Sequence, residues 1–316
     1  MTFAFTFPGQ GSQSVGMGRL LHDAYPAAAR VFEEVDDALG EKLSHLIFEG
    51  PEEALRLTAN TQPALMAVSL AAMRALEAEG VRVADARLVA GHSLGEYSAL
   101  AAAGALSIAD AARLLRLRGE AMQTAVPAGE GAMAALLGLD METAEEVARL
   151  AAEGDEVCDV ANDNAPGQVV VSGSLAAVER AVAIAKEKGA RRPMLLPVSA
   201  PFHCRLMAPA AEAMADALST VDLKAPAVPV LANVSLELLS DPAAIKASLV
   251  RQVTERVRWR ESVAKFASLG VTTQAEIGAG KVLAGLSKRI DKELVTMVVN
   301  TPDDVKAMAE NWVAAA

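Results

Sequence analysis

The feature that most constrains this chain is a serine bracketed by glycines between an apolar segment and an alanine-rich one. "ARLVA" (86–90) predicts a short buried strand, "LGEYSALAAAGAL" predicts a helix, and Ser93 lies between them in the pattern Gly91-x-Ser93-x-Gly95. A sharp strand-to-helix turn brings two backbones together, so it requires small residues two positions either side of the serine. The free N–H groups and positive potential of the helix N-terminus would stabilise an oxyanion there. The pattern therefore predicts a nucleophile elbow, and an ordinary glycine-bracketed turn is the alternative.

Strands and helices alternate over most of the chain, which predicts an α/β fold with a mainly parallel, hydrolase-like sheet flanked by helices. The strands are expected at 2–7, 86–90, 228–233 and 271–277. The helices are expected at 23–39, 63–79, 94–103, 107–124, 205–219, 243–252, 259–269 and 281–293.

The stretch 128–199 has a different order of elements. Strand, helix, strand, strand, helix and strand patterns follow one another there, with the turn Asn164-Ala165-Pro166-Gly167 joining the middle two strands. This β-α-β-β-α-β order is that of a ferredoxin-like unit. We therefore expect a small domain at 128–199, inserted into a large discontinuous domain formed by 1–127 and 200–316.

Composition and charge exclude several classes of protein. Hydrophobic residues make up 52% of the chain, so a disordered protein is excluded, and the net charge of −11 argues against a nucleic-acid partner. The apolar run "ALMAVSLAAM" ends at Arg74 and is too short to span a membrane, and the N-terminus has no basic stretch of a signal peptide. Cys158 and Cys204 form neither a disulfide framework nor a metal-ligand pattern. These observations predict a cytoplasmic protein with no membrane partner and no metal.

A serine nucleophile needs a base, and His203 in "VSAPFHCRLMAP" is the candidate among the four histidines. It follows a strand-like segment and a proline-stiffened turn, from which a loop residue could reach back over the sheet. His92 adjoins Ser93, but consecutive side chains at a tight turn usually diverge, so we expect it to line the pocket. A structural histidine is the alternative for His203. A histidine of ordinary pKa would stop acting as a base below about pH 6.5.

Two further segments suggest groups that bind anions. "FPGQGSQSVGMG" (7–18) follows the first strand but lacks the endings of nucleotide-binding loops. Its backbone N–H groups could instead complete an oxyanion hole with the N–H of Leu94, the residue after the nucleophile. Arg118 precedes Gly119, where another backbone can approach closely, and its guanidinium could bind a carboxylate through two parallel hydrogen bonds.

Together these segments resemble the malonyl-CoA:acyl-carrier-protein transacylases and the related acyltransferase domains of polyketide synthases. The resemblance runs in family order from "FPGQGSQ" through "GHSLGEYSAL", "RGEAMQ", "ANDNAPGQVVVSG", "PVSAPFHCRLM" and "VRQVTERVRW" to "EIGAGKVLAGLSKRI". One departure is Asp163, where an aromatic residue is commoner. The resemblance implies these roles: Ser93 as the acylated nucleophile, His203 as its base, Gln10 and Leu94 as oxyanion donors, Arg118 as the ligand of the malonyl carboxylate, Gln252 orienting His203 through its backbone carbonyl, Asn162 in the pocket wall, and Phe202 crowding the α-carbon of the acyl group.

The activity that the resemblance implies is ping-pong transfer of malonyl from malonyl-CoA to the phosphopantetheine thiol of acyl carrier protein, with no metal or redox cofactor. It would supply fatty-acid or polyketide synthesis. A serine esterase or thioesterase and a non-catalytic carrier-protein docking module are the alternatives. Basic residues that could meet an acidic carrier protein are Arg191, Arg192, Lys281, Lys288 and Arg289.

Overall fold

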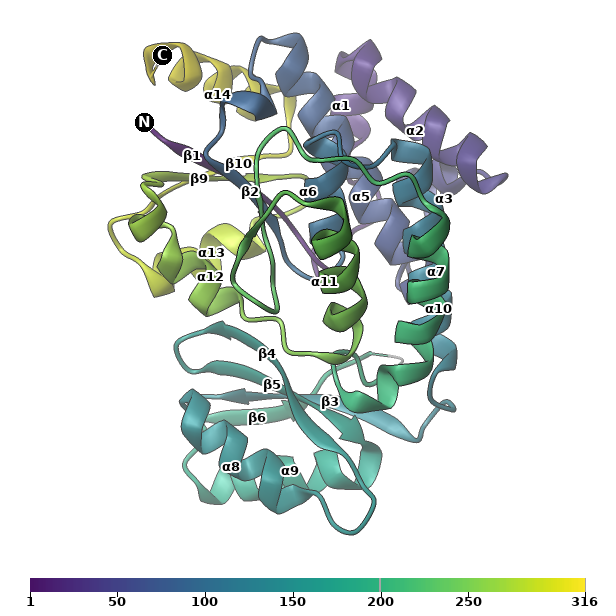
Figure 1. The fold of residues 1–316 in the computed structure, drawn as a ribbon, viewed down its shortest axis with the longest axis vertical. Coiled ribbons are helices and arrows are strands. Elements are labelled where there is room, and N and C mark those ends of the chain that lie inside the picture. Colours follow the sequence, from purple (N-terminus) through teal and green to yellow (C-terminus); the bar gives the residue numbers. More distant parts are fainter. Residues whose placement is uncertain (199, 316) are drawn as a thin grey trace.

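The computed structural model describes residues 1–198 and 200–315, which form two β-sheets with helices packed around them (Figure 1). The larger sheet has six strands in the order β10-β9-β1-β2-β7-β8. Neighbouring strands from β10 to β7 are parallel, and β8 is antiparallel to β7. The strands are β1 (Phe3–Phe7), β2 (Leu88–Gly91), β7 (Val230–Leu231), β8 (Leu238–Leu239), β9 (Thr273–Ile277) and β10 (Val295–Val299).

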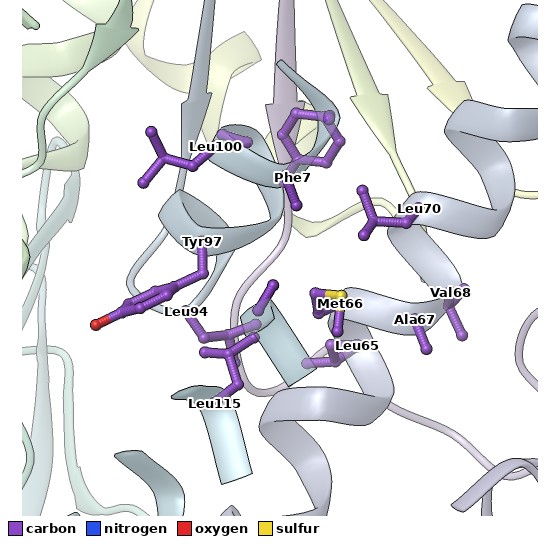
Figure 2. Close-up of a cluster of buried hydrophobic side chains, with 14 of the residues drawn as sticks. Phe7, Leu65, Met66, Ala67, Val68, Leu70, Leu94, Tyr97, Leu100 and Leu115 are labelled. Carbon is purple, nitrogen blue, oxygen red and sulfur yellow. The ribbon is translucent and has the colours of Figure 1, made fainter. Parts of the chain in front are cut away.

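Helices cover both faces of this sheet because successive strand residues point to opposite faces. Phe3, Phe5 and Phe7 of β1 pack into the larger core with α5, α6 and α7, whereas Ala4 belongs to a second core with α12 and α13. Figure 2 shows Phe7 among side chains of α5 and α6. The helices around the larger sheet are α1 (Arg19–Ala24), α2 (Pro26–Leu39), α3 (Leu43–Glu49), α4 (Glu52–Leu55), α5 (Thr58–Ala78), α6 (Gly95–Ala102), α7 (Ile108–Thr124), α10 (Ala208–Thr220), α11 (Pro242–Thr254), α12 (Trp259–Lys265), α13 (Val282–Ile290) and α14 (Pro302–Ala315).

The smaller sheet lies at residues 131–195 and is antiparallel throughout, in the order β4-β5-β3-β6. Its strands and helices follow one another in the order expected for a ferredoxin-like unit, with α8 and α9 packed on one face (Figure 1). The α/β fold with a parallel sheet and a small antiparallel one is thereby confirmed, while the domain limits at 127/128 and 199/200 stay predictions. The elements are β3 (Gly131–Leu137), α8 (Met141–Ala151), β4 (Cys158–Ala165), β5 (Gln168–Ser174), α9 (Leu175–Glu187) and β6 (Arg192–Leu195).

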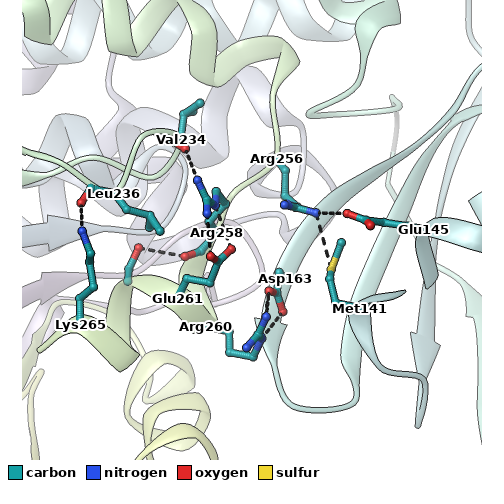
Figure 3. A network of polar contacts seen from close by, with 11 residues as sticks. Met141, Glu145, Asp163, Val234, Leu236, Arg256, Arg258, Arg260, Glu261 and Lys265 are labelled. Carbon is teal, nitrogen blue, oxygen red and sulfur yellow. Dashed lines mark hydrogen bonds and ion pairs between the residues drawn. The ribbon is translucent and has the colours of Figure 1, made fainter. Parts of the chain in front are cut away.

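Backbone and charged contacts join the smaller sheet to α12 and to the segment before it (Figure 3). The backbone N–H of Asp163 donates to the carbonyl of Val257 at 3.0 Å, and the buried Asp163 carboxylate accepts from Arg260 Nε at 2.9 Å. Arg256 pairs with Glu145 of α8 at 2.8 Å. Asp163, the one departure from the resemblance, therefore joins the smaller sheet to α12 and the segment before it.

Several elements differ from the sequence-based expectation. The helix expected at 23–39 is divided at Tyr25, because Pro26 starts a new helix at its first position. The helix expected from 63 begins at Thr58, and Pro63 lies inside it. The strand expected at 228–233 pairs only through Val230 and Leu231. Elements β8, β10, α3, α4 and α14 were not expected at all. Among the described helices, none combines the length and the apolar character that crossing a membrane requires.

Candidate active site

Ser93 lies at a strained turn between β2 and α6, with φ of 53°. A Cβ atom at Gly91 would lie 1.9 Å from the backbone of Gly95, and one at Gly95 would lie 2.2 Å from the carbonyl oxygen of Phe7. Neither position can hold a side chain, because both meet backbone atoms rather than movable side-chain atoms. The turn is therefore the sharp elbow that the glycine spacing predicts, and it presents Ser93 at the carboxyl end of β2.

His203 lies within hydrogen-bond distance of the serine hydroxyl. Ser93 Oγ is 2.8 Å from His203 Nε2, and His203 Nδ1 is 2.8 Å from the backbone oxygen of Gln252. A carbonyl only accepts, so the histidine proton is placed on Nδ1 and Nε2 is left to accept the serine proton. Burial, and then the positive charge of Arg118, lower the pKa of His203 to about 3. The imidazole is therefore neutral, as a general base must be.

Arg118 is almost completely buried beside the same hydroxyl, and the groups that it contacts are neutral. Its Nη1 donates to Gln62 Oε1 at 2.8 Å, and its Nη2 donates to Gln252 Oε1 at 2.9 Å and to Ser93 Oγ at 3.1 Å. Within the described chain, Nε has no hydrogen-bond partner and no carboxylate forms an ion pair with this guanidinium. Glu96 acts on Arg118 through its charge but forms no hydrogen bond with it. A buried cation whose hydrogen-bond partners are all neutral favours binding of an anionic ligand.

The absence of a side chain at Gly119 lets α7 pack closely on α5, and this close packing buries Arg118. A Cβ at Gly119 would lie 2.6 Å from the Cα of Ala59, so α7 and α5 approach each other backbone to backbone at this point. The close approach brings Arg118 next to Gln62 of α5. The expectation that Gly119 permits close approach of another backbone is confirmed.

A pocket opens over Ser93 between the two sheets. Gln10 and Leu94 line one side, and side chains of the smaller sheet, such as Met133 and Val170, line another. The backbone N–H groups of Gln10 and Leu94 donate no hydrogen bond to any described residue, so both are available to an oxyanion. Every expected site residue except Gln252 contributes to the wall of this pocket: Gln10, His92, Ser93, Leu94, Arg118, Asn162, Phe202 and His203.

His92, Asn162 and Phe202 occupy the wall without bonding to the serine hydroxyl. The Nε2 of His92 is 2.8 Å from Asn164 Oδ1, and its ring centroid lies 5.8 Å from that of Trp259. His92 is thus held away from Ser93 Oγ, in keeping with a wall position rather than a role as the base. Asn162 and Phe202 are both buried at the pocket surface.

Comparison with known proteins agrees with this geometry. The family described as "Acyl transferase domain" matches residues 4–293. The chain belongs to this acyltransferase family. The malonyl CoA-acyl carrier protein transacylase of Bacillus subtilis is 49% identical over 303 residues, covering 96% of this chain and 95% of that protein. The same-named protein of Escherichia coli K12 is 47% identical over 308 residues, covering 98% and 99%.

Solved structures of related acyltransferases superpose closely. The acyl-carrier-protein S-malonyltransferase of Bartonella henselae is 57% identical, with a TM-score of 0.96 over 98% of this chain and 99% of that one. A malonyl-transacylase in complex with its type II PKS acyl-carrier protein is 44% identical, with a TM-score of 0.95 over 98% and 100%. The resemblance to malonyl-CoA:acyl-carrier-protein transacylases is therefore confirmed.

Three polar residues of the acyltransferase site escaped the sequence analysis. Asn233 Oδ1 accepts from the backbone N–H of Ser93 at 2.8 Å, and its Nδ2 donates to the carbonyl of Gly91 at 2.7 Å. Glu96 lies buried in the first turn of α6, and Gln62 contacts Arg118. Only Glu96 gave a signal, as a charged residue at the start of an otherwise apolar helix.

Neither a metal site nor a reactive cysteine is present among the described residues. No cluster of three or more histidine, cysteine or acidic side chains there could hold a metal ion. Burial raises the pKa of the Cys158 thiol to about 12 and that of the Cys204 thiol to about 11. Both side chains therefore remain protonated thiols at neutral pH, which makes them poor nucleophiles.

Proposed function

We propose that this acyltransferase moves a malonyl group from malonyl-CoA to the phosphopantetheine thiol of an acyl carrier protein, through a malonyl-serine intermediate. The observation that carries the proposal is the buried Arg118 guanidinium, which has neutral partners and lies 3.1 Å from the hydroxyl of Ser93. A free carboxylate on the acyl group would supply the anion that this cation lacks. The names of the relatives at 47–49% identity support the same substrate and acceptor.

In the first half-reaction, Ser93 Oγ attacks the thioester carbonyl while His203 Nε2 takes the hydroxyl proton. The carbonyl oxygen becomes an oxyanion, for which the backbone N–H groups of Gln10 and Leu94 are the donors. The oxyanion then re-forms the carbonyl, the C–S bond breaks, and His203 returns the proton to the departing thiolate. Free coenzyme A leaves, and Ser93 carries the malonyl ester.

In the second half-reaction, the carrier thiol gives its proton to His203 Nε2 and its sulfur attacks the ester carbonyl of malonyl-Ser93. The same donors hold the oxyanion, the C–O bond breaks, and the proton returns to Ser93 Oγ. Throughout both steps the carbonyl of Gln252 keeps the His203 proton on Nδ1. Arg118 binds the carboxylate in both, so the acyl group stays in one position while its thiol partners exchange.

This chemistry uses only groups of the chain, so the proposed transfer needs no metal or redox cofactor; coenzyme A enters as part of a substrate. We further propose a cytoplasmic location and a role in supplying malonyl carrier protein to fatty-acid or polyketide synthesis. The catalytic residues would belong to a large domain at 1–127 and 200–316. The small domain at 128–199 would close the pocket against water, and no nucleic acid or membrane takes part.

The mass of the intact protein after mixing with malonyl-CoA tests the proposal. We expect a gain of one malonyl group, lost again on adding acyl carrier protein with its phosphopantetheine arm. Ser93→Ala, the matched control, should gain nothing. Release of free malonate without an adduct would instead indicate the esterase or thioesterase alternative, and no reaction at all would indicate a carrier-docking module.

A further inference from the structure

Gln252 connects three parts of the site through one side chain and one carbonyl. Its backbone oxygen accepts from His203 Nδ1 at 2.8 Å, and its side-chain Oε1 accepts from Arg118 Nη2 at 2.9 Å. Its Nε2 donates to the backbone oxygen of Ser93 at 3.1 Å and to Glu96 Oε2 at 2.8 Å. The orientation of this amide therefore decides whether Arg118 meets an acceptor or a donor.

Glu96 supplies the shorter of the two contacts that hold the amide nitrogen. The same carboxylate oxygen accepts from the backbone N–H of Asn233 at 3.1 Å, and the side chain of Asn233 spans the elbow from Ser93 N to Gly91 O. Glu96 Oε2 thus accepts hydrogen bonds from two residues. One is Gln252, whose carbonyl orients His203, and the other is Asn233, whose side chain bonds the backbone N–H of Ser93. The other oxygen, Oε1, has no hydrogen-bond partner within the described chain.

Reversal of the Gln252 amide would be unfavourable at both ends. Its oxygen would face Glu96 Oε2 and the Ser93 carbonyl, which are both acceptors, and its NH₂ would face the guanidinium of Arg118, which is only a donor. Such buried, unpaired groups are costly. Without an acceptor at position 96, Gln252 Nε2 would keep only its contact with the Ser93 carbonyl, which at 3.1 Å is the longer of its two hydrogen bonds.

We propose that Glu96 is a positioning residue that fixes the Gln252 amide and so aligns Arg118 for the malonyl carboxylate and His203 for Ser93. The proposal rests on the proposed malonyl transfer for its selectivity readout. It requires an acceptor oxygen at this place, not a negative charge. Burial raises the pKa of Glu96 to about 7, although the contacts with Asn233 and Gln252 and the charge of Arg118 lower it, so the carboxyl group accepts these hydrogen bonds whether or not it is ionised.

Three variants separate positioning from a structural role. Glu96→Gln keeps an acceptor oxygen of the same shape, whereas Glu96→Met keeps the length but removes the acceptor. Glu276→Met is the matched control, because Glu276 is equally buried and accepts from the backbone N–H groups of Leu283 and Ala284 at the start of α13, outside the pocket. Thermal unfolding records the stability of each.

The readout is the ratio of Ser93 acylation rates with malonyl-CoA and acetyl-CoA. We expect Glu96→Gln to keep the wild-type ratio. Glu96→Met should lower the ratio on the order of tenfold, because it removes the shorter acceptor of the Gln252 amide and leaves that buried N–H unsatisfied. Glu276→Met should change stability but leave the ratio alone. In a Gln252→Met background, Glu96→Met should lower the ratio no further, because the two residues act as one unit.

A loss of the ratio in Glu96→Gln, or an undiminished effect of Glu96→Met on top of Gln252→Met, would overturn the proposal. If Glu96→Met does not fold, the ratio in Glu96→Gln alone still shows whether position 96 needs only an acceptor oxygen or also a negative charge. Labelling of Ser93 by a fluorophosphonate needs the aligned Ser93–His203 pair but no malonyl group. Slower labelling in Glu96→Met but not in Glu96→Gln would support the positioning role, even if the wild-type protein failed to take up malonyl. Equal labelling rates in Glu96→Met and the wild-type protein would contradict it.

Discussion

At the scale of single residues, burial sets the chemistry of His203 more strongly than hydrogen bonding does. Its contact with the Gln252 carbonyl favours the protonated form, yet desolvation and the charge of Arg118 outweigh it and lower the pKa to about 3. The expectation from an ordinary histidine, that the base is lost below about pH 6.5, is therefore wrong for the folded protein. A lowered pKa means that the neutral base persists to lower pH.

We predict that the rate of Ser93 malonylation does not fall between pH 6.5 and pH 5. Rapid-quench measurement of this half-reaction across that range checks it, since the carrier thiol takes no part. Because Glu96 titrates near pH 7, the profile is also recorded for Glu96→Gln. A rate that is half-maximal near pH 6.5 and falls about tenfold per pH unit below it, in both proteins, would show that His203 has the pKa of an ordinary histidine.

Arg118 should determine selectivity for a carboxylated acyl group. We expect Arg118→Ala to lower acylation by malonyl-CoA on the order of a hundredfold while sparing or raising acylation by acetyl-CoA, because two charge-assisted hydrogen bonds are lost only with malonyl. Arg118→Lys should restore little, since lysine lacks the planar fork. Parallel rates with the two thioesters provide the test, and an equal loss with both would make Arg118 structural.

Phe202 should restrict the space at the α-carbon of the acyl group. Its side chain is buried in the pocket wall next to the base. Phe202→Ser should narrow the preference for malonyl-CoA over methylmalonyl-CoA by at most about 1–3 kcal/mol, which is what one methyl group contributes in a pocket. Competition between the two thioesters measures the ratio. An unchanged ratio would indicate that Phe202 does not touch the substrate.

Residue roles differ in how far the sequence can predict them. The turn at Ser93 depends on a local steric requirement for glycine at positions 91 and 95, so the sequence pattern is enough to predict it. Asn233 is 140 positions from Ser93 and Glu96 is 156 from Gln252, and no local pattern records such contacts. These buried polar partners became visible only when the fold brought the segments together.

At the scale of elements, packing decides where helices begin and end. The first turn of α5 lies against Gly119 of α7, and this contact extends the helix five residues before Pro63, where sequence propensity predicts its start. The helix expected at 281–293 ends at Ile290, and strand β10, which starts at Val295, was not expected. Alternation of strands and helices predicted the sheet, but element limits depend on contacts between segments distant in sequence.

Gly119→Ala should destabilise the protein by about 1–3 kcal/mol, because the added methyl group meets the backbone of Ala59 and Thr58. The displaced helix should also weaken malonyl acylation, since Arg118 moves with it. Gly285→Ala is the matched control: it lies in α13, and apart from its chain neighbours and the backbone of its own helix no atom of the described chain lies within 4 Å of the new Cβ. It should raise the free energy of unfolding by about 0.5–1 kcal/mol. Urea unfolding compares the two, and equal stabilities would contradict close packing at Gly119.

At the scale of the whole molecule, the proposed catalytic residues lie in turns and helices around the larger sheet, while Met133 and Val170 of the smaller sheet line the pocket. The β4–β5 turn is tied to α13, where Arg289 donates to Gln168 Oε1 and to the carbonyl of Pro166. Arg289 is therefore engaged within the chain and is a poorer candidate for docking than the sequence suggests. Arg191, Arg192, Lys281 and Lys288 are exposed.

Two of these exposed cations adjoin segments that line the pocket. Arg192 begins β6, which runs toward the pocket residues Leu196 and Val198. Lys281 follows Gly280, whose Cβ would lie 3.5 Å from Ser12, in the loop that carries Gln10. We expect an acidic carrier protein that inserts its arm into the pocket to meet these cations, although the net charge of −11 opposes its approach at long range.

We therefore predict that Lys281→Glu combined with Arg192→Glu raises the Michaelis constant for carrier protein on the order of tenfold at low salt. Surface charges act mainly on association, and their effect is screened beyond about 10 Å at 0.1 M salt, so the difference should shrink as salt is added. Acylation of Ser93 by malonyl-CoA should change little. Lys306→Glu reverses one exposed charge on α14, a helix that lies far from the smaller sheet in Figure 1. It is the matched control for the single variants Lys281→Glu and Arg192→Glu, which are measured beside the double variant. Steady-state transfer at two salt concentrations measures the effect. The docking position would be wrong if the control raised the Michaelis constant equally, or if both half-reactions slowed together.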